Sequence, residues 1–156
     1  MQCEPDSTIL QELSIRDQMV ASALDQVLRY EDFPPGKEHL LVLNILSEDT
    51  AYTFRISVSS SNGLGRYLYW RNIRPNGYFY FKGYLVLVFA KQLDGLLNRE
   101  SHFRDFPFLS FERYRPKTPN PYIPSIYEPI VHVYRYVDST LTLKSTDMLE
   151  VIELKR

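Results

Sequence analysis

The sequence predicts an α+β fold, with one N-terminal amphipathic helix packed on a strongly curved, mainly antiparallel sheet of about six to eight strands. An apolar stripe at three- and four-residue steps occurs near the N-terminus, whereas much of the remaining chain alternates with a period of two. With 156 residues, 44% of them hydrophobic, the chain has the size and composition of one globular domain. We therefore expect a tail or tether over residues 1–13 and a single domain over residues 14–156. Within the tail, residues 8–13 are expected to form an extra turn of helix or a short strand.

The predicted helix begins at Ser14 and Asp17, which have the spacing of a capping box. It ends before the breaker Pro34-Pro35-Gly36. Its apolar stripe, on a helix of about four turns, comprises Met19, Val20, Ala23, Leu24, Val27 and Leu28.

The period of two predicts the strands that follow. Residues 39–47 are apolar on both faces and are expected to lie centrally in the sheet, while residues 51–59 alternate as a strand with one wet face. Residues 66–72 and 78–82 are predicted as two strands joined around Pro75-Asn76-Gly77, ahead of a buried strand at residues 84–90.

The C-terminal part is predicted as a short helix at residues 94–101 and further strands at 106–114, 129–137, 140–143 and 148–154. Residues 116–129 hold five of the ten prolines, so we expect them to form an extended surface connection. The order of elements is similar to that of cystatin-like and NTF2-like folds, an analogy that carries no function.

The net charge of −1 hides a separation of charge along the chain. Residues 1–50 carry ten carboxylates and three cations, whereas residues 51–117 carry four carboxylates and eleven cations. Such polarisation favours steered recognition of a complementary partner. The near-neutral total argues against a dedicated nucleic-acid binder.

Catalytic signals are weak, and an enzyme is less expected than a binding protein. His39, His102 and His132 lie far apart and belong to no metal-ligand or nucleophile motif. We expect His132 to be exposed or partly buried on a sheet. No catalytic residue, metal or other cofactor is predicted.

Residues 66–84 are rich in aromatic residues and contain four cations but no carboxylate. If both predicted strands form, Leu68, Trp70, Phe79 and Phe81 enter the core. The outward panel then consists of Tyr67, Tyr69, Tyr78 and Tyr80, edged by Arg71 and Lys82. Tyr and Arg are enriched at protein interfaces, although the same rings also serve as ordinary sheet packing. The candidate partner-binding residues are Tyr67, Tyr69, Arg71, Arg74, Tyr78, Tyr80, Lys82, Arg113 and Arg115.

The favoured function is a non-enzymatic protein–protein interaction module, such as a small bacterial immunity or accessory protein. The alternative is a curved-sheet pocket protein for a small apolar or aromatic ligand, with hydrolase or isomerase activity possible. This alternative predicts polar groups such as His132, Tyr134 or Asp17 facing a cavity. The third hypothesis is single-stranded nucleic-acid binding by the tyrosine panel.

A cytoplasmic location is favoured over an envelope location, because no segment is apolar and long enough to span a membrane and the sequence shows no basic start followed by the apolar stretch of a secretory signal. Cys3 is the only cysteine, which excludes an intramolecular disulfide. If Met1 and Gln2 are not part of the mature chain, Cys3 becomes the first residue of a processed bacterial lipoprotein, and the location becomes the periplasm or envelope.

Overall fold

The computed structural model describes residues 8–31, 33–36, 38–93, 95–115 and 129–148. Within these residues the order of elements confirms the α+β class. The elements are β1 (Ile9–Ile15), α1 (Gln18–Glu31), β2 (His39–Glu48), β3 (Ala51–Ser60), α2 (Ser61–Arg71), β4 (Gly77–Phe81), β5 (Tyr84–Ala90), β6 (Leu97–Asp105), η1 (a 3-10 helix, Pro107–Leu109), α3 (Phe111–Tyr114), β7 (Ile130–Val137) and β8 (Thr140–Met148).

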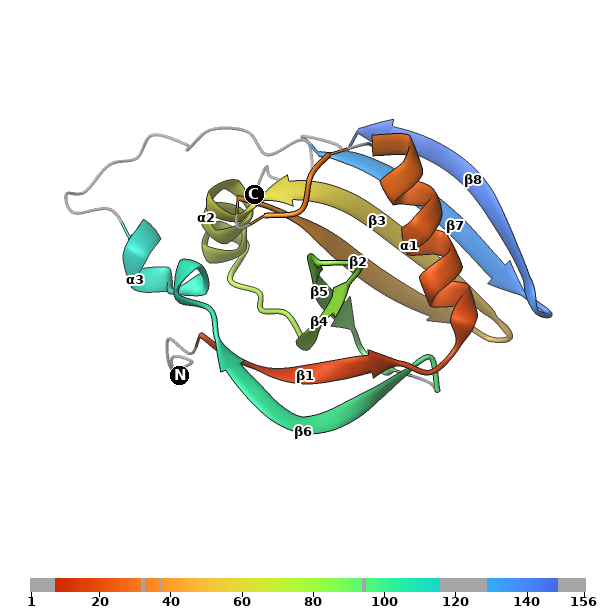
Figure 1. Cartoon of the computed structure of the whole chain (residues 1–156), viewed down its shortest axis with the longest axis horizontal. Helices are drawn as coiled ribbons and strands as arrows, with labels where there is room; N and C mark the ends of the chain where they lie inside the picture. The colour runs from red at the N-terminus through yellow and green to blue at the C-terminus, as the bar shows by residue number, and fades with distance from the viewer. Residues whose placement is uncertain (1–7, 32, 37, 94, 116–128, 149–156) are drawn as a thin grey trace.

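All eight of these strands belong to one open, curved sheet with the order β6-β1-β4-β5-β2-β3-β7-β8 (Figure 1). Strands β1 and β4 are parallel, as are β2 and β5, and the other neighbouring pairs are antiparallel. The predicted central position of β2 is confirmed, since it lies between β5 and β3. Strands β1 and β2, from the acidic part of the chain, each lie between two strands from the basic part, so the separation of charge along the sequence does not give two separate halves of the sheet.

Helix α1 matches the predicted stripe but not the predicted cap. Val20, Ala23, Leu24 and Val27 are all buried, because their spacing places them on one helical face against the sheet. The cap is Asp17, whose Oδ1 accepts a hydrogen bond from the Met19 backbone N–H at 2.9 Å. The predicted capping role of Ser14 is wrong, because that residue is still in β1.

The predicted strand at residues 66–72 is also wrong, because residues 61–71 form helix α2. Both ends of this helix are capped: the Ser60 hydroxyl accepts a hydrogen bond from Gly63 N–H at 3.0 Å, and Asn72 ends the helix with a left-handed φ of 58°. Leu64 and Leu68 are one turn apart and both buried. These caps and this spacing outweigh the strand propensity of the aromatic residues.

Part of the tail predicted over residues 1–13 belongs to the folded domain, because strand β1 begins at Ile9. Leu10 and Leu13 are buried on opposite faces of the sheet, and this burial holds the strand in place. Two other predicted elements have the wrong type of secondary structure. Residues 97–105 form strand β6 where a helix was predicted, and residues 107–114 form η1 and α3 where a strand was predicted. Pro107 begins η1, where its missing N–H costs no hydrogen bond.

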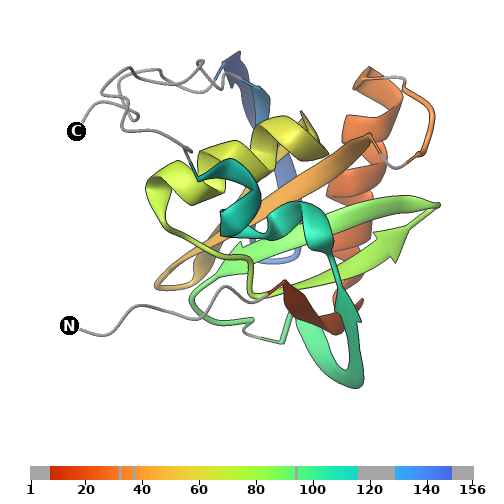
Figure 2. The same cartoon turned by 90° about the vertical axis from the view of Figure 1, so that its left-hand side faces the viewer.

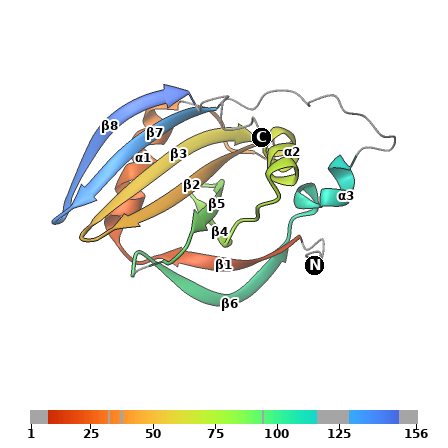
Figure 3. The same ribbon diagram turned by 180° about the vertical axis from the view of Figure 1, so that it is seen from behind.

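Two hydrophobic clusters lie on the two faces of the sheet. Helix α1 covers one face over β2, β3 and β7, where Leu43, Phe54 and Ile56 are fully buried. Helix α2, with η1 and α3 beside it, covers part of the opposite face (Figures 2 and 3). The second cluster there includes Leu64 and Leu68 of α2.

Tight turns join the hairpins. Asp138-Ser139 forms the predicted turn between β7 and β8, with φ values of 50° and 62°. Lys82-Gly83 joins β4 to β5 with φ values of 51° and 86°, as in a type I′ turn, which makes the glycine useful at this position. The proline-rich connection (residues 116–128) and most of the predicted strand at 148–154 lie outside the described residues. Among the described helices, none has the length and apolar character needed to cross a membrane.

Candidate functional site

The strand register places four side chains in two rows on the face of the sheet that α2 only partly covers. Asn44 of β2 pairs with Arg55 of β3, and Val42 pairs with Ser57 one step further along. Phe89 of β5 continues the first row beside Asn44. Because alternate strand residues point to the same face, these side chains form the floor of a pocket.

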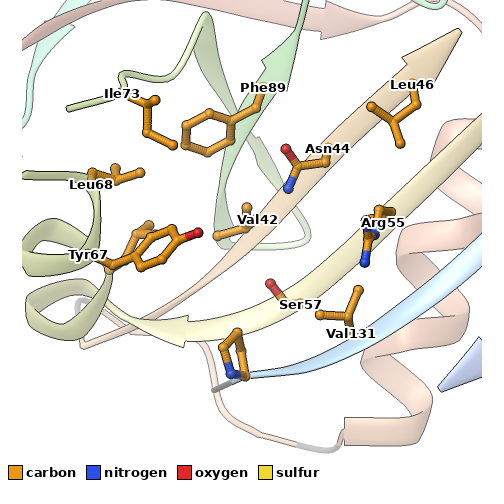
Figure 4. Close-up of a pocket in the computed structure, with 12 residues that line it drawn as sticks. Val42, Asn44, Leu46, Arg55, Ser57, Tyr67, Leu68, Ile73, Phe89 and Val131 are labelled. Carbon is orange, nitrogen blue, oxygen red and sulfur yellow. The ribbon is translucent and has the colours of Figure 1, made fainter. Parts of the chain in front are cut away.

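Helix α2 supplies one wall of this pocket. Leu64, Tyr67 and Leu68 lie on one helical face and contact the space above the floor, with Ile73 beyond the helix end (Figure 4). The rim and remaining lining are Leu46, Pro129 and Val131. The pocket has a volume of about 180 Å³. It is therefore close in size to an apolar cavity of about 150 Å³ that binds benzene, and smaller than sites of roughly 300 Å³ or more for drug-sized ligands.

Polar groups converge on an otherwise apolar lining. In Figure 4 the Asn44 amide and the Tyr67 hydroxyl point into the space between α2 and the sheet. Ser57 is buried, and Arg55 is half-buried. None of the described residues that line the pocket is acidic. Within the described part of the chain Arg55 has no ion-pair partner, whereas Arg135 on the neighbouring strand lies 3.8 Å from Glu48. The described lining of the pocket therefore has a positive charge without a carboxylate of its own.

Four of the sequence-predicted site residues lie on or just after α2. Tyr67 lines the pocket, and the Arg71 guanidinium lies 6.0 Å from its ring centre. Tyr69 packs edge-on against Phe111 of α3 at 5.4 Å. The Arg74 guanidinium lies 4.2 Å from the Phe111 ring centre and donates a hydrogen bond to a backbone carbonyl of η1. All four of these side chains therefore contact neighbours within the fold.

The β4 residues do not form one panel with them. Tyr78 is buried against Phe106, and this burial raises the pKa of its hydroxyl above 10.0. Tyr80 is 47% exposed. Lys82 pairs with Asp25 of α1 at 2.5 Å on the other face of the molecule, and its hydrogen bond lowers the pKa of that carboxyl below 3.8. The four-tyrosine panel is therefore wrong, because a helix replaced one of its strands and Tyr78 points inward.

The last two predicted residues belong to the short helix α3 and its end. Arg113 is exposed, and Arg115 is exposed and pairs with Glu112. Of the core residues predicted beside the panel, Leu68 and Phe79 are buried, whereas Trp70 and Phe81 are half-buried. The structure thus places the nine predicted site residues on several surfaces, and only Tyr67 among them lines the pocket.

Two polar pairs lie on the α1 face, one at each end of the helix. His132 is 1% exposed, so the prediction of an exposed or partly buried histidine is wrong. Its Nε2 lies 2.6 Å from a carboxylate oxygen of Glu31, and its Nδ1 lies 3.4 Å from the Thr146 hydroxyl. Tyr136 donates a hydrogen bond of 2.7 Å to Asp17, and this bond is the main cause that raises the pKa of Tyr136 above 10.0. These side chains lie on the opposite face from the pocket that was found.

Sequence reasoning missed Asn44, Arg55 and Ser57. One signal was available for Asn44, because it is a polar residue inside a strand that is otherwise apolar on both faces. Arg55 and Ser57 looked like the wet face of a surface strand, and only the position of α2 turns that face into a pocket. Among the described residues, no group of three or more His, Cys, Asp or Glu side chains is arranged to hold a metal ion.

Comparison with protein-family models, with curated proteins and with solved structures found no match to this chain. The geometry of the pocket therefore carries the functional inference.

Proposed function

We propose that this protein binds a small apolar or aromatic molecule in the pocket between α2 and the sheet. The observation that carries the proposal is the convergence of Asn44, Arg55 and Ser57 in a pocket whose other walls are mainly apolar. Ligand sites combine apolar walls with a few placed polar groups in this way. The polar groups orient the ligand, and burial of its apolar part supplies most of the affinity.

The proposal is limited to binding. The polar groups of the lining are an amide, two hydroxyls and a guanidinium. At neutral pH a guanidinium stays protonated and does not act as a base, and a hydroxyl needs an adjacent base to become a nucleophile. The lining therefore supports recognition of a ligand better than acid–base chemistry.

Filling the pocket tests the proposal. Val131 is a buried part of the lining on β7, and Val131→Phe is expected to occupy the space. Ile130→Phe is the matched control, because the neighbouring side chain points to the other face and is 42% exposed. With toluene and indole as probes, chemical shifts of the pocket residues are expected to change in the native chain and in Ile130→Phe, but not in Val131→Phe. Equal responses in all three chains, or no response in the native chain at about millimolar probe, would refute the proposal.

A second candidate function is the protein-binding role that the sequence analysis favours. One observation in the structure supports this role. Tyr80 and Arg104 form an exposed pair on the sheet, with the guanidinium 5.5 Å from the ring centre. Tyr and Arg are residues that interface hot spots favour. Tyr80→Ala should weaken capture of a partner without lowering the melting temperature, whereas loss of stability would assign Tyr80 a packing role. The nucleic-acid hypothesis gains no such support, because its rings do not form one panel.

A further inference from the structure

Resting on the ligand-binding function above, we propose that the ligand is a small monocarboxylate. Its carboxylate pairs with Arg55 and Asn44, and its tail is about one aromatic ring, or a branched aliphatic group of that size, packed between Val42, Phe89 and α2.

The charge of the pocket is the first step. A half-buried cation without a counter-ion is unfavourable, because burial removes part of its hydration. With respect to the described residues, Arg55 is such a cation on the pocket floor: its direct cross-strand neighbours are the neutral residues Asn44 and Val133. Arg135 lies two residues further along β7 from Val133 and has Glu48 within ion-pair distance. A bound anion would give Arg55 the partner that Arg135 already has.

The arrangement of donors is the second step. A guanidinium presents a planar set of N–H donors that matches the two oxygens of a carboxylate. The Asn44 side chain starts about 5 Å away, directly opposite on β2, and its NH₂ group adds two donors. Ser57 and Tyr67 contribute hydroxyl groups to the same pocket. Donors for one carboxylate group are therefore present on adjacent strands.

The size and the apolar walls define the rest of the ligand. A volume of about 180 Å³ leaves room for a tail of roughly one ring once the carboxylate is placed. Val42, Leu46 and Val131 are aliphatic, and Phe89 adds an aromatic surface. A phosphate ester carries close to two charges, about twice what one guanidinium neutralises. The single cation among the described lining residues therefore favours a monocarboxylate over a phosphate.

The test compares benzoate with benzamide, which has the same ring and nearly the same shape but no charge. Titration calorimetry on the full chain gives both dissociation constants. Native protein is expected to bind benzoate about tenfold or more tightly than benzamide, since charged hydrogen bonds are the stronger ones. Arg55→Met should weaken benzoate binding about tenfold or more and leave benzamide within about threefold. Arg135→Met, the matched control on the same face, should change neither.

The stability of the variants keeps the test interpretable. Because Arg55 has no carboxylate partner within the described chain, Arg55→Met is expected to melt at the native temperature or above it. If Arg55→Met does not fold, Arg55→Lys is used in its place. The positive charge remains but the planar set of guanidinium donors is lost, so the affinity for benzoate should fall while staying above that for benzamide.

The outcomes separate the two proposals. Equal affinity of native protein for benzoate and benzamide, or benzoate binding that survives Arg55→Met, overturns the carboxylate inference and leaves the pocket function standing. If neither compound binds the native chain, and toluene and indole also fail, both proposals are wrong. A loss of benzoate binding in Arg135→Met equal to that in Arg55→Met also overturns the inference, because the effect would then be one of general charge.

Discussion

Removing Glu31 should destabilise the protein far more than removing a comparable surface glutamate. Glu31 is the last residue of α1, and one of its carboxylate oxygens lies 2.6 Å from Nε2 of His132 on β7. The His132 side chain is 1% exposed, whereas that of Glu31 is 21% exposed. The pair therefore joins the end of the helix to the sheet beneath it. Glu31→Ala leaves a buried imidazole nitrogen without its partner.

Two opposing effects set the magnitude. A hydrogen bond to a charged group contributes about 1.5–3 kcal/mol, and its loss here also strands a buried polar atom that water cannot easily reach. Against this, a carboxylate at a helix C-terminus is unfavourable by about 0.3–1 kcal/mol, a cost that Glu31→Ala removes. The first effect is larger, so we expect a net loss of about 1–2 kcal/mol. For a chain of this size that corresponds to a fall in melting temperature of roughly 2–8 °C.

Urea unfolding followed by circular dichroism measures this loss. Glu48→Ala is the matched control, because Glu48 is 65% exposed and lies 3.8 Å from Arg135, and it should cost less than about 1 kcal/mol. A double-mutant cycle of Glu31→Ala with His132→Leu should give a coupling energy of at least about 1 kcal/mol. Glu31→Ala within about 0.5 kcal/mol of the native chain, or no coupling in the cycle, would refute the reasoning.

Two further predictions concern packing and pH. Gly65→Ala should cost about 1–3 kcal/mol, because its Cβ would lie 2.6 Å from the backbone oxygen of Phe108, whereas Gly36→Ala has open space and should be nearly neutral in thermal melts. The folded state holds the Tyr136 hydroxyl proton more tightly than the unfolded state, because that hydroxyl is hydrogen-bonded to Asp17. The stability from this bond is full below pH 10 and is lost as the pH rises through the raised pKa. Tyr136→Phe should therefore lose less stability than the native chain between about pH 8 and about pH 11, and equal losses would contradict the assignment.

The sequence predicts those parts of the fold that depend on local periodicity. The stripe from Val20 to Val27 identifies α1, because only a helix places these apolar side chains on one buried face. The apolar run in residues 39–47 identifies a central strand, because only such a strand buries the side chains on both of its faces. Residues 61–71 are different, since aromatic residues are favoured in strands and tolerated in helices. The helix at these residues is stabilised by its two caps, which are the hydrogen bond from Gly63 N–H to the Ser60 hydroxyl and the left-handed conformation of Asn72. Such caps are recognisable in a sequence only when the segment is already suspected to be helical.

The pocket is less predictable than the fold because it depends on distant segments meeting. Asn44 and Arg55 face each other through the β2–β3 register, but Tyr67 joins them only because α2 folds back across the same face. The sequence favoured the aromatic-rich segment as a surface feature, and of that segment's candidate residues only Tyr67 lines the site. A polar side chain inside a doubly apolar strand, as at Asn44, is the better local signal, because burial of an amide requires a partner.

His132 and Arg55 are polar side chains at adjacent positions in the sheet, and they differ in where a partner for each can come from. Ile56 of β3 pairs with His132 of β7, and the preceding residue, Arg55, pairs with Val133, so His132 and Arg55 lie in adjacent rows on opposite faces. The buried His132 has Glu31 within the fold, whereas Arg55 has no carboxylate from the described part of the chain. If Arg55 served packing alone, an apolar side chain of similar size could replace its half-buried guanidinium with little loss of stability. Its presence in a ring-sized apolar pocket is what a site for an external anion requires, and this is why substitution of Arg55 should change ligand affinity before it changes stability.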